Sequence, residues 1–145
     1  PMVFDSDNMP DITVNGLGGA FDPPKNGGVE QQLKDKNSLL NFYKRIIKVK
    51  LQNPEIARGR ITEVCDFDDE KVGAFFTEYD ENKVLIIHNF DSEETKSLDI
   101  TDDMVPNADV AADLITTENG KAELKDGKLT LSPHSSVVIR SKEKE

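Results

Sequence analysis

The sequence has 145 residues, and 28 acidic residues outnumber 18 basic ones, which gives a net charge of −10 at pH 7. This excess of acid excludes nucleic acid and an anionic membrane surface as partners, because both require clustered Lys and Arg. No apolar run approaches the ~20 residues that cross a membrane. The single cysteine, Cys65, excludes a disulfide framework and a zinc cluster of cysteines.

The first predicted segment, residues 1–34, is an irregular loop. It is rich in proline and glycine and poor in apolar residues, which is the composition of turns. A structureless loop of this length in a compact domain is normally a functional lid or depends on a neighbour for support. The sequence begins at Pro1 rather than at Met, so we expect it to continue a longer gene product.

Residues 35–53 are predicted to form an amphipathic helix that Asp35 or Asn37 caps. Six apolar side chains recur at the spacing of one helical face: Leu39, Leu40, Tyr43, Ile46, Ile47 and Leu51. Pro54 disfavours helical geometry at Asn53 and ends the helix. Each such side chain would forfeit ~1.5–3 kcal/mol in water. We therefore expect a cover, either the chain's own sheet or a partner outside this sequence.

Residues 55–141 are predicted to form an antiparallel β-sandwich of Greek-key type, so the fold class is mainly β. About eight strands are expected, near 60–66, 71–79, 83–90, 95–100, 110–117, 121–125, 128–132 and 136–141. Val84–Ile87 is apolar on both faces, which is typical of a central strand. Tight turns are expected at Asp80–Asn82, Asn119–Gly120 and Asp126–Gly127, since Asn-Gly and Asp-Gly tolerate positive φ.

Two acidic clusters and a glycine-rich segment are the first candidates for ligand binding. Asp5–Asn8 and Asp66–Glu70 lack the glycine and the distal bidentate glutamate of a calcium loop, which favours solvated charge. Gly16–Gly19 begins like a phosphate-binding fingerprint, but Phe21 occupies the third glycine position and no strand precedes it. Neither feature predicts a metal or nucleotide site.

The histidines and the cysteine do not form a predicted catalytic group. His88 shares strand parity with Val84 and Ile86, so it is predicted to be a partly buried structural residue, whereas His134 follows a proline in a turn and should be exposed. No Ser or Cys is predicted in a nucleophile setting beside either histidine, and Cys65 is expected to be inert core. Nothing in the pattern builds the carboxylate-lined cleft of a glycosidase.

The predicted helix nevertheless carries a familiar pattern. Lys36–Ile47 reads KNSLLNFYKRII, and Gln52–Gly59 reads QNPEIARG. Together they resemble the last barrel helix of the α-amylase family of glycoside hydrolases (family 13), which typically reads SLLNxYKxLIxLRxxNP. Pro1–Phe4 resembles the family's PMxW stretch, with Phe4 in place of Trp. Gly28–Gln32 resembles the VExQ lead into that helix.

The β region resembles the same family. Val84–Phe90 is similar to the NF strand of the family's C-terminal β-domain, and Leu129–Val138 to its closing LxLxPxSSVV strand pair. The resemblance covers the whole chain in collinear order. It implies three segments, namely a barrel-rim loop (1–34), the last barrel helix (35–54) and the C-terminal β-sandwich domain (55–145).

The resemblance also implies that the catalytic residues are missing. In this family a nucleophilic Asp, an acid/base Glu and a second Asp lie at the ends of barrel strands, all upstream of the PM stretch. We therefore assign no catalytic, cofactor-binding or metal-binding residue. In the rim loop Asp11, Asn15 and Phe21 are candidate contacts with sugar at outer subsites.

The function implied by the resemblance is that of a parent enzyme. It would hydrolyse α-glucosidic bonds in starch-like glucans or oligo-α-glucosides. The resemblance implies no cofactor in this fragment and allows a calcium ion in the parent enzyme. The fragment itself would be inactive and would support the missing barrel. Alone, it would cover the helix face by self-association or with its first segment. An extracellular or cell-envelope location is favoured over the cytoplasm, and the α-1,4 or α-1,6 bond specificity stays open.

The alternative is an autonomous carbohydrate-binding or oligomerisation β-sandwich module without enzyme activity. A binding module would have affinity for α-glucan with no upstream enzyme, and an oligomerisation domain would have a fixed stoichiometry that survives dilution. The absence of Trp and the large apolar helix face speak against the binding module.

Overall fold

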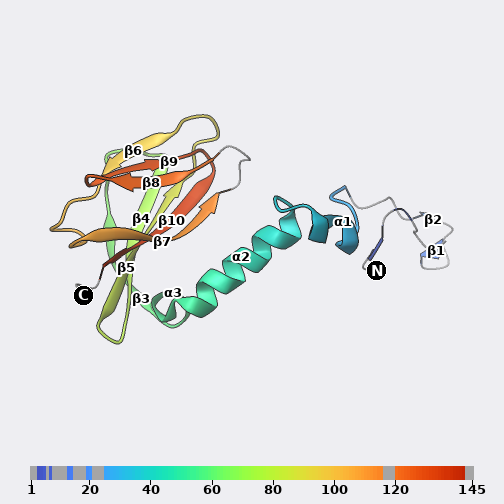
Figure 1. The fold of residues 1–145 in the computed structure, drawn as a ribbon, viewed down its shortest axis with the longest axis horizontal. Coiled ribbons are helices and arrows are strands. Elements are labelled where there is room, and N and C mark those ends of the chain that lie inside the picture. Colours follow the sequence, from blue (N-terminus) through green and yellow to red (C-terminus); the bar gives the residue numbers. More distant parts are fainter. Residues whose placement is uncertain are drawn as a thin grey trace. The chain divides into compact units, whose positions relative to one another are not determined.

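The computed structural model of the chain describes residues 3–5, 7, 13–14, 19–20, 25–115 and 120–142. The chain divides into two compact units, Pro1–Arg45 and Ile46–Glu145, and helix α2 (Leu39–Gln52) contributes residues to both. Figure 1 labels the elements. The predicted division into segments 1–34, 35–54 and 55–145 stays a prediction. Among the helices described, none is long and apolar enough to cross a membrane.

The first unit contains a short helix where the sequence predicted only a loop. Helix α1 (Val29–Lys34) follows a two-residue antiparallel pair, β1 (Thr13–Val14) and β2 (Gly19–Ala20). The prediction of an irregular segment is therefore wrong for residues 29–34. The side-chain amide of Asn41 donates to the carbonyl groups of Gln32 and Asp35, at 2.9 and 2.8 Å. These contacts satisfy the last carbonyls of a helix too short to be stable alone.

The start of α2 also differs from the prediction. The helix begins at Leu39, and the Ser38 hydroxyl accepts a hydrogen bond from the backbone N–H of Asn41 at 3.2 Å, which is the geometry of an N-cap. Asp35 instead accepts from the backbone N–H of Asn37 in a local turn. The cap is thus Ser38, and neither Asp35 nor Asn37 has this role.

Helix α2 ends at Gln52, two residues before Pro54, as the sequence predicts. The backbone N–H and the side-chain amide of Asn53 both donate to the Val49 carbonyl, at 3.1 and 2.6 Å. Pro54 then occupies the first position of a further short helix, α3 (Pro54–Ala57), where its missing N–H costs nothing. The chain turns into the first long strand at Gly59. A Cβ atom there would lie 1.9 Å from the Glu55 carbonyl oxygen, so only glycine fits.

The second unit is a two-layered β-sandwich, which confirms the mainly β fold. One sheet has the order β3 (Arg60–Cys65), β4 (Val72–Tyr79), β5 (Asn82–Asn89), β10 (Ser135–Ser141), β7 (Ala108–Ile115). The other has the order β6 (Lys96–Asp99), β9 (Lys128–Leu131), β8 (Ala122–Lys125). All neighbouring strands are antiparallel. Figure 1 shows the two sheets as separate layers.

Two of the predicted turns are confirmed. Asp80 and Glu81 join β4 to β5 with φ of 51° and 67°, and Asp126 and Gly127 join β8 to β9 with φ of 51° and 74°. Two consecutive positive φ values match the right-handed twist of the flanking strands. The third predicted turn, Asn119–Gly120, includes a residue that lies outside the described ranges.

The core fills the space between the two sheets. Leu85, Ile87, Leu129, Leu131 and Ile139 are fully buried there. All four residues of Val84–Ile87 are at most 8% exposed, which confirms β5 as a central strand with cover on both faces. Side chains alternate along the strand, so Leu85 and Ile87 enter this core while Val84 and Ile86 point to the opposite side.

Candidate docking face

The five-stranded sheet has a second apolar surface, which we call the outer face because it is turned away from the three-stranded sheet. The strand register places Val64, Phe75, Ile86, Val138 and Ala112 in one row across all five strands. An apolar row on each face is typical of a sheet covered on both sides. The outer face therefore requires cover in the same way as the core does.

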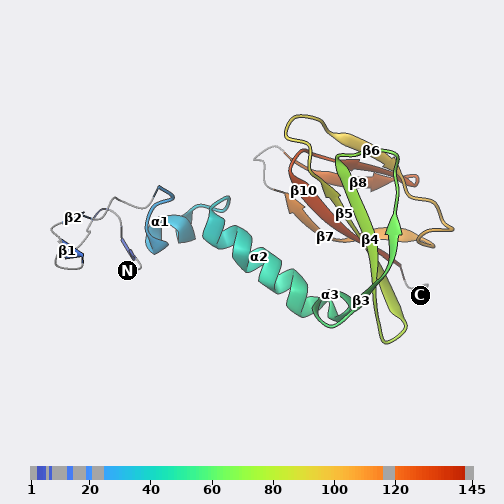
Figure 2. The same cartoon turned by 180° about the vertical axis from the view of Figure 1, so that it is seen from behind.

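The chain covers the outer face only in part. Val49 near the end of α2 and Ile56 of α3 pack against a cluster formed by Val84, Ile86 and Val138. Other apolar side chains remain in water, with exposed fractions of 61% for Ile61, 78% for Val64 and 61% for Phe90. Figure 2 shows α3 beside the beginning of β3, at one end of this sheet.

Helix α2 carries the apolar face that the sequence predicts, and that face is exposed. Leu39, Tyr43, Ile47 and Leu51 have exposed fractions of 51%, 57%, 54% and 76%, and we call these four residues the α2 stripe. The other two predicted members, Leu40 and Ile46, are half-buried, and no residue of α2 is fully buried. Within the unit Ile46–Glu145, the sheets thus leave Ile47 and Leu51 exposed.

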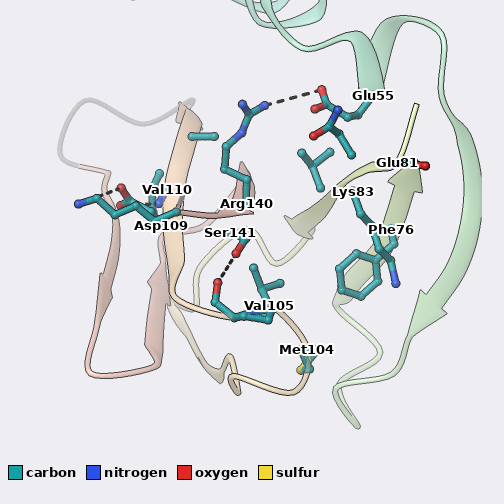
Figure 3. A pocket seen from close by; sticks show the side chains of 15 residues that line it. Glu55, Phe76, Glu81, Lys83, Met104, Val105, Asp109, Val110, Arg140 and Ser141 are labelled. Carbon is teal, nitrogen blue, oxygen red and sulfur yellow. Dashed lines mark hydrogen bonds and ion pairs between the residues drawn. The ribbon is translucent and has the colours of Figure 1, made fainter. Parts of the chain in front are cut away.

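A polar cluster fixes α3 to the sheet. The Arg140 guanidinium on β10 donates to the side-chain oxygen of Asn53 at 2.5 Å and lies 3.7 Å from the Glu55 carboxylate. Figure 3 shows this ion pair between α3 and β10. Glu55 is only 7% exposed, so its charge depends on Arg140 for compensation. The cluster sets the position of α3 and of the end of α2 on the outer face.

A groove of about 1080 Å³ lies next to this cluster, between the β4–β5 turn and the end of β10 (Figure 3). Each of its three cations has an acidic partner in the described structure. Arg140 pairs with Glu55, Lys142 with Asp109 at 4.0 Å, and Lys83 with Glu63 at 3.0 Å. Its aromatic residue, Phe76, is 3% exposed and is covered by the Lys83 ammonium 3.8 Å above the ring. Among the described residues that line it, the groove thus offers a ligand neither an unpaired cation nor an open ring.

His88 is a half-buried residue of the outer face, as predicted, but it has a serine neighbour that the sequence did not reveal. Its Nδ1 lies 2.6 Å from the Ser136 hydroxyl oxygen. The ring also lies between Phe75 and Phe90, with centroid distances of 5.8 and 5.6 Å. Burial lowers the pKa of His88. Gly73 makes room for this stack, since a Cβ there would approach the Phe90 ring to 2.8 Å.

The His88–Ser136 pair lacks the third member of a catalytic triad. No carboxylate is hydrogen-bonded to the His88 ring among the residues that the structure describes. A serine nucleophile needs its histidine to be oriented by such a group. The pair therefore links β5 to β10 and holds the ring in the sheet surface. This contact depends on the pairing of β5 with β10, which places Ser136 opposite His88, so the sequence alone did not predict it.

The acidic cluster Asp66–Glu70 is not simply solvated, because Asp69 belongs to an ion-pair network. The Lys96 ammonium lies 3.1 Å from Asp69, 3.4 Å from Asp91 and 3.1 Å from Glu94. Backbone N–H groups of Glu93 and Glu94, together with Lys96, hold the pKa of Asp91 at about 2. The described part of the chain contains no group of three side chains that could hold a metal ion.

The remaining candidates of the sequence analysis have different outcomes. His134 is exposed in a turn, as predicted, and Cys65 is half-buried against the core, where burial raises the pKa of its thiol. In the first acidic cluster, Asp5 accepts a hydrogen bond from the Gln31 amide at 2.8 Å. Asp11, Asn15, Phe21 and residues 16–18 of the glycine-rich segment lie outside the described residues.

Comparison with known proteins agrees with this architecture. Residues 72–138 match the family model of the α-amylase SusG C-terminal domain. Over 122 residues the chain is 25% identical to α-amylase 3 of Dictyoglomus thermophilum, covering 83% of this chain and 22% of that protein. Over 144 residues it is 24% identical to an oligo-1,6-glucosidase of Bacillus cereus, covering 98% of this chain and 25% of that protein.

A solved structure with the same fold extends the comparison. Eubacterium rectale Amy13B superposes with a TM-score of 0.74 and 29% sequence identity, over 89% of this chain and 25% of that one. The chain thus spans about a quarter or less of the length of the relatives it matches. These findings show that the chain belongs to the α-amylase family of glycoside hydrolases (family 13), of which it is the C-terminal β-domain with the helical segment that precedes it.

Proposed function

We propose that the parent protein hydrolyses α-glucosidic bonds in starch-like glucans or oligo-α-glucosides, and that this region supports its catalytic barrel without taking part in the chemistry. The names of the relatives, an α-amylase and an oligo-1,6-glucosidase, support the reaction class. Their length supports a larger parent, since the chain covers only 22–25% of each.

The exposed α2 stripe is the observation that carries the structural role. Its four side chains would each contribute ~1.5–3 kcal/mol if they were buried, which is an upper bound. A soluble domain does not normally leave such a stripe in water unless another surface covers it. The catalytic barrel of the same polypeptide is the surface that we propose, with Leu39, Tyr43, Ile47 and Leu51 packed against it.

The isolated chain has no barrel, so a second copy would take its place on the stripe. We expect the purified 145-residue chain to self-associate through α2, and light scattering at several concentrations measures its mass. A monomeric chain at every concentration would argue against this substitution.

Activity on soluble starch tests the proposed function. The full-length parent should release reducing sugar, and the 145-residue chain alone should release none, because glycosidic chemistry needs two facing carboxyl groups across a cleft. Maltose and isomaltose as parallel substrates distinguish α-1,4 from α-1,6 specificity. Hydrolysis by the purified chain itself, or a parent inactive on all three substrates, would overturn the proposal.

A further inference from the structure

The turn that leads into α1 contains an asparagine followed by two glycines. Residues 25–28 read KNGG, and the structure describes all four. Asn26 is exposed, and Gly27 has a φ of 74°, a backbone conformation that glycine adopts without strain. Two other Asn-Gly pairs occur in the sequence, Asn15–Gly16 and Asn119–Gly120, and each includes a residue outside the described ranges.

An asparagine before a glycine can react with its own backbone. The amide nitrogen of the glycine attacks the side-chain carbonyl carbon of the asparagine and closes a five-membered succinimide ring. In this chain the new bond joins Gly27 N to Asn26 Cγ, and the Cγ–Nδ2 bond breaks. The Nδ2 group takes up the proton that the glycine nitrogen loses and leaves as ammonia. Glycine favours this reaction because it has no Cβ atom beside the attacking nitrogen.

The structure leaves the attacking nitrogen accessible. Among the described residues, no group accepts a hydrogen bond from the Gly27 N–H. An N–H that is already hydrogen-bonded must first give up that bond, and its loss costs free energy. Gly27 instead uses its carbonyl oxygen, which accepts from the Gln32 side-chain amide at 3.2 Å. Water reaches the exposed Asn26, and the later opening of the ring requires water.

Two other described asparagines lack these conditions. Asn37 is also exposed, but the N–H of the next residue, Ser38, donates to the Asp35 carbonyl at 3.1 Å. Asn41 lies in α2, where the N–H of Phe42 donates to the Ser38 carbonyl at 2.9 Å. In both cases the following residue has a side chain and its N–H is engaged. The comparison favours Asn26 as the reactive position.

We propose that Asn26 is a site of spontaneous deamidation in this protein, with water as the co-reactant. Water adds to either carbonyl carbon of the succinimide and breaks its bond to the Gly27 nitrogen. Opening on the Cγ side yields aspartate with the ordinary main chain, and opening on the other side yields isoaspartate, whose main chain runs through Cγ. Both products add a negative charge to a chain with a net charge of −10. This reaction does not depend on the glycosidase function proposed above.

The isoaspartate product should disturb the start of α1, because it lengthens the main chain by one carbon atom. The backbone N–H groups of Val29 and Glu30 donate to the carbonyl groups of Val3 and Phe4, at 3.1 and 2.9 Å. These bonds connect the first described residues to the start of the helix, shortly after Asn26. The aspartate product preserves the main chain. We therefore expect faster hydrogen exchange at these two N–H groups in the isoaspartate product alone.

Peptide mapping of the full-length parent and of the 145-residue chain tests the site. Trypsin releases Asn26 in the peptide 26–34, which contains no other asparagine, and releases Asn37 and Asn41 in the peptide 37–44. During incubation in mildly alkaline buffer, the first peptide should gain the mass that replacement of NH by O adds, several-fold faster than the second. Isoaspartate in it should accept a methyl group from isoaspartyl methyltransferase. Mildly acidic buffer should slow the reaction, because the attacking nitrogen must lose its proton.

Two variants and a control separate this reaction from other changes of mass. Asn26→Gln keeps a side-chain amide but closes a larger ring far more slowly, so the mass gain should disappear from the peptide 26–34. Gly27→Ala places a Cβ atom beside the attacking nitrogen and should slow the reaction several-fold. Asn37→Gln is the matched control at an exposed asparagine and should leave the rate at Asn26 unchanged.

The outcomes for the modification and for the enzyme are distinguishable. An unchanged peptide 26–34 in the incubated parent would overturn the proposal, as would a mass gain that persists in Asn26→Gln. Equal rates in the two peptides would also refute it, because the Gly27 N–H would then give Asn26 no advantage. A parent that deamidates at Asn26 but hydrolyses no glucan would leave the modification standing and remove the proposed function.

Discussion

The two faces of the five-stranded sheet have similar apolar character but opposite surroundings. On the inner face Leu85, Ile87 and Ile139 are fully buried against the three-stranded sheet. On the outer face and on α2, side chains of the same kind, such as Val64 and Ile47, are more than half exposed. The difference shows that the chain buries the inner face fully and leaves part of the outer face in water.

The largest expected effect separates the two faces directly. Ile87→Ala opens a cavity in a fully buried site, so it should lower the free energy of unfolding of the isolated chain by about 2–5 kcal/mol. Ile47→Ala removes atoms that already contact water and should change it by less than about 0.5 kcal/mol. Urea unfolding measures both. In the full-length parent Ile47→Ala should become clearly destabilising, and equal effects in the two proteins would contradict a barrel on the stripe.

The next effect concerns the polar cluster that joins α3 to the sheet. Arg140→Ala leaves the buried Glu55 carboxylate without its counter-charge and should cost about 1–3 kcal/mol. Lys142→Ala is the matched control on the same strand end, because its pair with Asp109 is exposed and long, and it should cost less than about 0.5 kcal/mol. Hydrogen exchange should show faster opening of residues 54–58 in Arg140→Ala only.

A second substitution sharpens that result. Glu55→Gln in the Arg140→Ala background replaces the uncompensated charge with a neutral amide and should recover part of the lost stability. A double variant no more stable than Arg140→Ala would mean that Arg140 acts through packing of its long side chain rather than through charge.

The smallest expected effect on stability comes from the Lys96 ion-pair network, which consists of charged groups rather than apolar side chains. Folding lowers the pKa of Asp91 from 3.8 to about 2, so the ionised carboxyl stabilises the folded state above pH ~4. This contribution should be lost as the pH falls from about 4 towards 2. Melting temperatures measured between pH 6 and pH 2 should fall less steeply in Asp91→Asn, whose stability should already be lower at pH 6. Parallel curves for the two proteins would contradict the pKa shift.

The strands and their turns could be predicted from the sequence because both depend on local chemistry. The alternating or fully apolar runs predicted β3 to β10 to within a few residues, and Asp126–Gly127 predicted its hairpin through the backbone freedom of those residues. The apolar stripe of α2 could be predicted for the same reason, since its spacing is a property of the helix itself. The resemblance to the α-amylase family added the expectation of a catalytic barrel outside this chain.

Contacts between residues far apart in the sequence were decided by the tertiary structure alone. Arg140 reaches Asn53 across 87 positions, and Ser136 meets His88 across 48, because β10 inserts between β5 and β7. The α1 helix and its Asn41 contacts escaped prediction because six residues do not form a helix on local propensity. Sequence periodicity therefore determined which surfaces are apolar, whereas strand order and packing decided which of them this chain could bury for itself.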